Sequence, residues 1–166
     1  YHILDKQISI VECFSDIFAR NSRSDNYYTP NSSFFEVSPQ TWQSFDIAWM
    51  FPPGSFIPIL LNLLSKLQQD NSGALDNVFL VLTSDNLSPN ERKGRLNKRS
   101  NDLINSAIVL RVFSPSNNNG YHFATGRASI GKDLQRTLHS NEHYSLIAFP
   151  NPDMPKLRKH MAFGRK

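Results

Sequence analysis

Apolar residues recur along the chain at two different spacings, and these spacings predict where helices and strands lie. From Ile3 to Ala19 the large apolar residues fall at helical intervals, which predicts a helix with one apolar face. A second helix is predicted to open at Ser55 or Pro58 and to run to about Gln69. Its apolar stripe consists of Ile59, Leu60, Leu63, Leu64 and Leu67.

Short apolar runs between turn residues predict strands. The clearest run is Val78–Leu82, where five consecutive apolar residues are typical of a strand buried on both faces. A similar run predicts a second buried strand at Ala107–Phe113. Further strands are expected at Phe34-Phe35, Phe45–Phe51, Tyr121–Thr125 and Ser145–Phe149.

Polar and proline-rich stretches separate these segments. Pro52-Pro53-Gly54 ends the strand at Phe45–Phe51, because proline cannot continue a ladder of hydrogen bonds. A long polar loop is expected from Ser84 to Asn101, a turn or mobile loop over Ser114–Gly120 and a short helix at Asp133–Leu138. Strands that alternate with helices favour an α/β or α+β fold. We therefore predict a single domain over residues 1–149, with a small mixed sheet and two or three packed helices.

Length and composition agree with one domain. The chain has 166 residues, 39% of them hydrophobic, and its 12 Phe can fill a core. No apolar run approaches the ~18 residues of a membrane span. Cys13 is the single cysteine, so an intrachain disulfide is excluded, and its apolar surroundings predict a core residue. These features favour an intracellular, reducing compartment.

The charge is distributed unevenly along the chain. Residues 1–91 contain four Lys or Arg and ten Asp or Glu, whereas residues 92–166 contain fourteen and four. A split of this kind is typical of a protein that presents its basic part to an anion such as a nucleic acid. The alternative is an ordinary solvated surface on which the charges mix.

Two basic clusters lie in the second part. One is a basic loop over residues 92–99, and the other follows the prolines of an extended tail over residues 150–166. Mobile cationic segments bind nucleic-acid backbones by releasing counterions, and such tails become ordered on RNA. We expect RNA contacts from Arg92, Lys93, Arg95, Lys98, Arg99, Lys156, Arg158, Lys159, Arg165 and Lys166.

A phosphate-binding motif is the second candidate. Residues 126–133, Gly-Arg-Ala-Ser-Ile-Gly-Lys-Asp, fit G-x-x-x-x-G-K and resemble the phosphate loop of nucleotide-binding proteins. The resemblance implies that Gly126, Gly131 and Lys132 would hold phosphate. Asp133 occupies the position where that family has Ser or Thr for magnesium, and this puts the nucleotide site in doubt. A turn capped by Asp133 explains the same residues.

A third resemblance concerns a structural class of protein. The run Trp49–Pro58, with Pro52-Pro53-Gly54 at its centre, looks like the end of a strand in picornavirus-like capsid proteins. Val11–Arg20 and Ala148–Pro152 resemble further segments of that family, in the same order. The resemblance implies a capsid-like structural subunit.

The chain lacks the usual signs of catalysis. It has no G-x-S-x-G, H-E-x-x-H or C-x-x-C motif. His139 and His143 have the spacing of a metal pair, but Ser140-Asn141 between them indicates a helix end. We therefore predict a non-enzymatic subunit with no metal, cofactor or small-molecule substrate, whose partners are RNA and other protein subunits. Aromatic residues expected in a core or an interface are Tyr27, Tyr28, Phe34, Phe35, Trp42 and Trp49.

Overall fold

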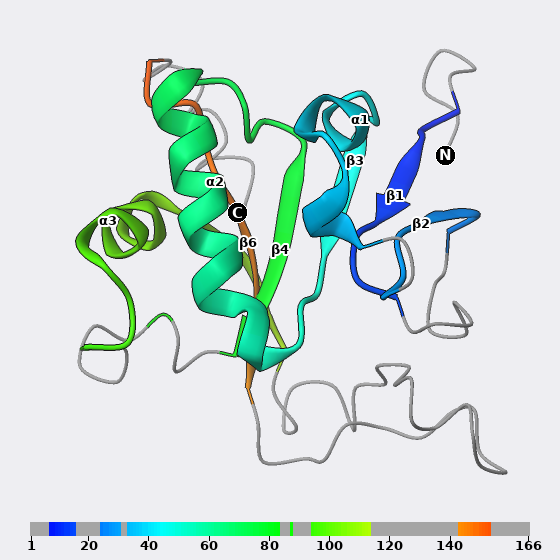
Figure 1. The fold of residues 1–166 in the computed structure, drawn as a ribbon. Coiled ribbons are helices and arrows are strands. Elements are labelled where there is room, and N and C mark those ends of the chain that lie inside the picture. The colour runs from blue at the N-terminus through cyan, green and yellow to red at the C-terminus, as the bar shows by residue number, and fades with distance from the viewer. Residues whose placement is uncertain are drawn as a thin grey trace, which may run out of the picture.

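A six-stranded mixed sheet forms the centre of the protein (Figure 1). The computed structural model describes residues 7–15, 24–30, 33–83, 87, 94–113 and 143–153. The spatial order of the strands is β2-β1-β3-β4-β6-β5. Their bounds are Ile10–Glu12 (β1), Asn26–Tyr27 (β2), Ile47–Met50 (β3), Val78–Thr83 (β4), Ile108–Phe113 (β5) and Tyr144–Ala148 (β6). The expected α/β domain with a mixed sheet is confirmed.

The sheet is mostly parallel. β1 pairs in parallel with both β2 and β3, and β3 pairs in parallel with β4. β6 runs antiparallel between β4 and β5, with Leu80 opposite Ile147 and Val109 also opposite Ile147. Because β6 is the reversed strand, β5 points in the same direction as β4. The carboxyl ends of β1 to β5 therefore lie at one edge of the sheet.

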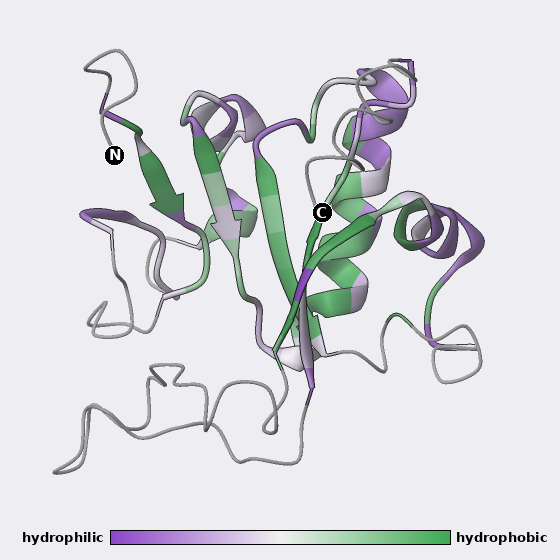
Figure 2. Cartoon of the chain, turned by 180° about the vertical axis from the view of Figure 1, so that it is seen from behind, coloured by the Kyte–Doolittle hydropathy of each residue, from purple (hydrophilic) through white to green (hydrophobic). Residues whose placement is uncertain are grey.

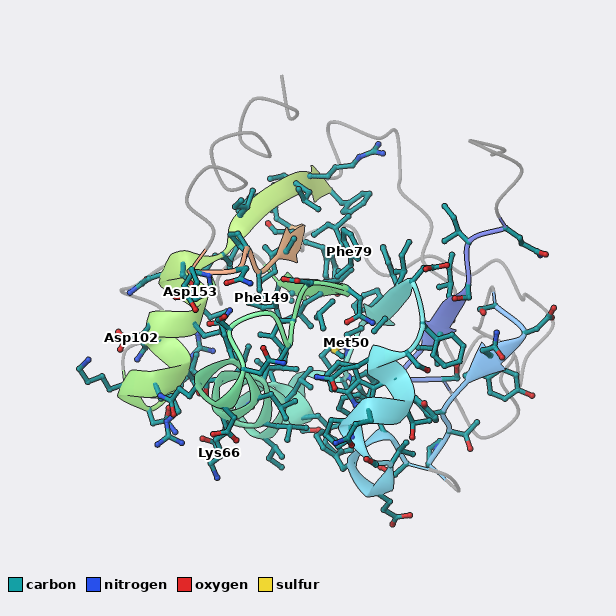
Figure 3. The ribbon with its side chains drawn as sticks, turned by 90° about the horizontal axis from the view of Figure 1, so that it is seen from above. Met50, Lys66, Phe79, Asp102, Phe149 and Asp153 are labelled. Atoms are coloured by element: carbon teal, nitrogen blue, oxygen red, sulfur yellow. The ribbon has the colours of Figure 1, made fainter. Side chains whose placement is uncertain are left out.

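The helices of the described residues cover one face of this sheet. They are α1 (Pro39–Gln43), α2 (Ile57–Asp70) and α3 (Lys98–Ser106), with two 3-10 turns, η2 (Phe34–Glu36) and η3 (Gly54–Phe56). Figure 3 shows α1, α2 and α3 on the same side of the sheet. No helix of the described ranges is long and apolar enough to cross a membrane.

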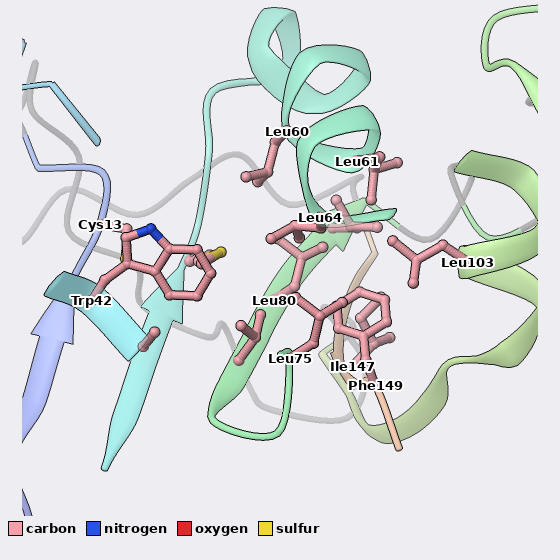
Figure 4. Packing of buried hydrophobic residues seen from close by; sticks show 14 of the residues in the cluster. Cys13, Trp42, Leu60, Leu61, Leu64, Leu75, Leu80, Leu103, Ile147 and Phe149 are labelled. Carbon is pink, nitrogen blue, oxygen red and sulfur yellow. The ribbon is translucent and has the colours of Figure 1, made fainter. Parts of the chain in front are cut away.

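The core lies between α2 and the sheet (Figure 4). Leu60, Leu61 and Leu64 of α2 are fully buried against Leu80 and Ile147 of the central strands. Burying a leucine side chain of this kind stabilises a fold by about 1.5–3 kcal/mol. Cys13 is buried in the same cluster, so the prediction of a core cysteine is confirmed.

The opposite face of the sheet carries a smaller apolar cluster. Val81 and Tyr144 are buried there. Trp49, Phe51, Phe113 and Leu146 pack around them and are partly buried. Figure 2 looks onto this face and shows the described strands in front of the helices. Parallel strands are usually apolar on both faces, and this sheet follows the rule.

The sequence predictions for α2, β3, β4 and β6 are confirmed, and three others are wrong. The predicted helix from Ile3 to Ala19 contains β1, and Val11 in β1 and Cys13 directly after it are buried in the core at strand spacing. Phe34-Phe35 forms a 3-10 turn, because the Ser33 side chain accepts a hydrogen bond from the Phe35 amide. The polar loop expected as far as Asn101 ends earlier, since α3 begins at Lys98.

The strand predicted at Ala107–Phe113 is present, but it is not the buried strand that we expected. β5 is the last strand of the described sheet, and its side chains are only partly buried or exposed. An irregularity between Val109 and Arg111 interrupts its pairing with β6. Ile59, which we placed in the buried stripe of α2, is 57% exposed. The segments predicted at 114–120, 121–125 and 133–138 lie outside the described residues.

The described residues do not form the jelly roll that capsid proteins of this class have. A jelly roll packs two antiparallel sheets face to face, whereas the described residues form a mostly parallel sheet with helices on one face. The Pro52-Pro53-Gly54 segment joins β3 to α2 through the turn η3. A strand-to-helix connection of this kind belongs to α/β architecture.

Candidate nucleic-acid interface and the carboxyl edge of the sheet

The connections that follow β1, β3, β4 and β5 all leave from the carboxyl edge of the sheet, the lower edge in Figure 1. The predicted basic loop, residues 92–99, covers the end of the connection from β4 to α3 and the first two residues of α3. The connection from β5 to β6 contains residues 126–133, which resemble a phosphate loop. The strands that precede these two segments in the sequence, β4 and β5, therefore end at the same edge. Open α/β sheets bind their ligands at this edge.

The predicted tail leaves from the other edge. β6 runs away from the carboxyl edge and ends at Ala148, and Phe149 and Pro150 after it are buried. The chain then turns at Asn151, whose side-chain oxygen accepts a hydrogen bond from the Asp153 amide. Its basic residues follow that turn in the sequence. The basic loop therefore follows a strand that ends at the carboxyl edge, whereas the tail follows a strand that ends at the other edge.

Three cations of the basic loop lie within the described residues. Arg95, Lys98 and Arg99 are all exposed at the start of α3. The Lys98 ammonium group forms an ion pair with the Asp102 carboxylate at 2.9 Å, and both side chains are largely exposed. Exposed pairs of this kind add about 0.3–0.5 kcal/mol on a helix, so the pair does little to fix the cation.

The remaining predicted contact residues fall on parts of the chain outside the described ranges. These are Arg92, Lys93, Lys156, Arg158, Lys159, Arg165 and Lys166, and the phosphate-loop residues Gly126, Gly131 and Lys132. The predictions for them stay predictions.

The start of α3 is built from asparagine side chains and one glycine. The Asn97 side-chain oxygen accepts a hydrogen bond from the Ser100 amide at 2.8 Å, which caps the helix. The Asn101 side chain donates to the Leu96 carbonyl at 3.2 Å. Gly94 has a φ of +79°, a conformation that glycine adopts without strain. These contacts hold the start of α3, and so the backbone that carries the cations, in a defined position on the surface.

The cations lie at the end of α3 where positive charge does not stabilise the helix. The N-terminal end of a helix carries partial positive charge and favours acidic residues. α3 has no acidic residue in its first turn and begins with Lys98 and Arg99. In the Lys98–Asp102 pair the cation precedes the carboxylate along the chain, and this order stabilises a helix less than the reverse order does. The cations at the start of α3 are therefore not explained by helix stability, whereas an anion bound there would be stabilised by both the charges and the helix end.

A second feature of the same edge is the junction of β1 and β3. β1 connects along the chain to β2 on one side of it, while β3 lies on its other side. The order of the strands thus reverses between β1 and β3, which is where open α/β sheets most often bind ligands. The residues that follow these strands are Cys13, Phe14 and Ser15 after β1 and Phe51–Gly54 after β3.

Ser15 is the unusual residue at this junction. Its amide donates to the Tyr28 carbonyl at 2.9 Å, and the Tyr28 amide donates to the Glu12 carbonyl at 2.9 Å. The side chain is buried, with 7% of the residue exposed, and its Oγ has no hydrogen-bond partner within the described part of the chain. A buried hydroxyl without a partner costs about 1–3 kcal/mol, so it calls for an explanation such as a bound polar group.

Aromatic rings surround the residue before it. The Phe14 ring lies 5.2 Å from the Phe34 ring, 5.8 Å from the Phe35 ring and 6.4 Å from the Phe56 ring, measured between centroids. Phe34 is buried, whereas Phe56 is 40% exposed. Phenylalanine rings thus lie at the carboxyl ends of β1 and β3 together with the Ser15 hydroxyl, which has no partner among the described residues.

Cys13 does not supply a nucleophile at this junction. Burial, with a smaller effect from the Glu12 carboxylate, raises the pKa of the Cys13 thiol far above its usual range. The thiolate is the reactive form of cysteine, and this environment suppresses it. Among the described residues, no group of three His, Cys, Asp or Glu side chains could hold a metal ion.

No sequence pattern pointed to Ser15. Our prediction placed it inside a helix from Ile3 to Ala19, where its side chain would have no special role. Its importance follows from the three-residue strand before it and from the strand order, which depend on pairing with distant residues. By contrast, the cations at the start of α3 were predicted from composition alone.

Comparisons of this chain with protein-family models, with curated proteins and with solved structures found no significant match.

Proposed function

We propose that this protein is a non-enzymatic subunit of a larger intracellular assembly and that it contacts RNA through the basic loop and the basic tail. The observation that supports the proposal is the exposed pair Lys98 and Arg99 at the positive end of α3, where helix stability does not account for them. In this proposal the cations hold phosphates by charge, and no bond is made or broken. Other protein subunits are the second class of partner.

Binding of RNA with and without the tail tests this proposal. The measurement is the affinity for a labelled single-stranded RNA at 50 and 200 mM salt, for the full chain and for a chain that ends at Pro155. We expect affinity to fall steeply with salt, because each neutralised phosphate releases counterions, and to weaken on truncation. No binding at low salt would overturn the proposal. Equal binding by both chains would show that the tail does not contact RNA.

A second candidate function is the binding of a small ligand between the carboxyl ends of β1 and β3. The observation that favours it is the buried Ser15 hydroxyl, which has no partner among the described residues, at the point where the strand order reverses. The Glu12 carboxylate at the end of β1 and the absence of a glycine-rich sequence after it disfavour a phosphate. The exposed ring of Phe56 suits a flat base. A neutral or cationic nucleoside fits this chemistry best.

Three ligands with the same base and ribose separate the possibilities by charge. They are adenosine, AMP and S-adenosylmethionine, whose 5′ substituents are neutral, anionic and cationic. We expect calorimetric titration to detect adenosine or S-adenosylmethionine and to detect AMP more weakly. Preference for AMP, or no binding of any of the three, would contradict this candidate. Either result leaves the RNA proposal unaffected.

A further inference from the structure

Two exposed apolar side chains lie where the turn η3 leads into α2. Phe56 is 40% exposed and Ile59 is 57% exposed. Both follow Pro53 and Gly54, at the carboxyl edge of the sheet. An exposed phenylalanine and isoleucine, three residues apart at the start of one helix, form a small apolar surface.

The ring of Phe56 is held in place although it is exposed. It packs edge-on against the Phe35 ring, with centroids 5.7 Å apart and planes at 71°, and it lies 6.4 Å from the Phe14 ring. Its amide donates to the Pro53 carbonyl at 2.9 Å, which closes the turn η3. A flat ring that is already ordered loses little entropy when a second flat group stacks on it.

A hydrogen bond joins this apolar surface to the start of α3. The Asn97 side chain donates to the Asn62 side-chain oxygen at 3.2 Å. Asn62 follows Ile59 by three residues on α2, and Asn97 directly precedes Lys98. Phe56, Ile59 and Asn62 follow one another at three-residue intervals, so they wind around α2 by about a third of a turn, from the Phe56 ring toward α3. The exposed cations Arg95 and Lys98 are near Asn97 in the sequence, on the α3 side of this hydrogen bond.

We infer that this surface is a track for single-stranded RNA, on which a base stacks on Phe56 and phosphates contact Arg95 and Lys98. The inference rests on the proposed RNA function and names the form of RNA. Single-strand binding combines aromatic side chains that stack bases with cations that follow the backbone. The hydrogen bond from Asn97 to Asn62 joins the helix that follows Phe56 to the residue before Lys98. Duplex RNA hides the faces of its bases, so it would contact only the cations.

Replacement of Phe56 tests the track. Phe56→Leu keeps an apolar side chain against Phe35 but removes the flat ring. We expect affinity for a ten-nucleotide single strand to fall by about tenfold, as for the loss of one stacked base. Affinity for a ten-base-pair duplex and the salt dependence of binding should not change, because no charge is lost. Phe56→Trp should restore or strengthen single-strand binding.

Tyr27→Ala is the matched control. Tyr27 is 44% exposed on β2, the far strand of the described sheet, so it presents an aromatic ring away from the track. Its loss should leave single-strand affinity unchanged. Circular dichroism confirms that each variant is folded.

The outcomes separate the track from the general proposal. If Phe56→Leu binds the single strand as well as the unaltered chain does, or weakens single strand and duplex equally, the track is overturned and RNA binding stands. If the unaltered chain binds neither form at low salt, both are overturned. If Phe56→Leu instead abolishes association with a protein subunit and spares RNA binding, the surface belongs to a protein interface and the track is overturned.

Discussion

Two neighbouring residues at the end of β1 show how strongly local surroundings set the chemistry of a side chain. Cys13 and Ser15 are both buried and both follow the strand at alternate positions. The Cys13 thiol is weakly polar and packs in an apolar core like a small hydrophobic group. The Ser15 hydroxyl is a strong donor and acceptor, and it has no partner among the described residues. Burial therefore costs little free energy for the Cys13 thiol and more for the Ser15 hydroxyl.

Cys13 should make stability depend on alkaline pH. Its pKa is raised in the folded protein by burial and by Glu12, whereas in the unfolded chain it is near 8.5. The unfolded chain therefore loses the proton first, and the free energy of unfolding falls as pH rises above about 8.5, by up to about 1.4 kcal/mol per pH unit. Urea unfolding at pH 7 and pH 10 measures the fall.

Cys13→Ala is the control for this pH dependence. It should be less stable than the unaltered chain at pH 7, because it leaves a small cavity. The difference between the two proteins should shrink toward pH 10. A difference that stays constant would show that Cys13 does not titrate on unfolding.

Ser15→Ala should separate a structural role from a ligand role. Removing a buried hydroxyl that has no partner removes its desolvation cost, so the variant should be as stable as the unaltered chain or more stable by about 1 kcal/mol. Thermal unfolding measures this without any ligand. If the variant is less stable by 1 kcal/mol or more, the hydroxyl has a partner within the folded chain.

At the scale of elements, sequence predicted the long segments and missed the short ones. α2 has fourteen residues with a periodic apolar stripe, and β4 is an unbroken apolar run, so each is specified locally. β1 has three residues, and it is a strand because Val11 pairs with Ala48, far along the chain. Its apolar residues fit both a helix and a strand. Local spacing could not decide between them.

α3 was missed for a different reason. It has nine residues, and Leu103 and Ile104 are its two buried hydrophobic residues, so it carries almost no apolar stripe. Its start depends on a cap in which Asn97 bonds to the Ser100 amide. The first four residues of the helix therefore fell within the polar loop that we expected from Ser84 to Asn101, and no element was predicted for residues 102–106.

Removal of this cap should destabilise α3. Asn97→Ala loses the hydrogen bond to the Ser100 amide and should reduce the free energy of unfolding by about 1 kcal/mol. Asn97→Ser keeps an oxygen at the cap and should retain most of that free energy. Urea unfolding of the two variants measures the difference. Equal loss in both would assign the effect to the bond with Asn62 rather than to the cap.

At the scale of the whole molecule, the order of the strands in the sheet determines where the candidate sites lie, and no single sequence motif does so. The carboxyl edge gathers the basic start of α3, the exposed ring of Phe56 and the unpaired hydroxyl of Ser15. Charge composition predicted the first of these. The other two depend on which strands are neighbours, and strand order was not specified by any local pattern.

Neutralisation of the described cations tests the central proposal most directly. We would compare a triple variant, Arg95→Gln with Lys98→Gln and Arg99→Gln, with a charge-preserving one, Arg95→Lys with Lys98→Arg and Arg99→Lys. The measurement is affinity for single-stranded RNA over a range of salt. We expect neutralisation to weaken binding and to lower the slope of log affinity against log salt by about two, at about 0.7 for each cation. The charge-preserving variant should bind as the unaltered chain does. If the neutralised variant keeps the same affinity and slope, the start of α3 does not contact RNA.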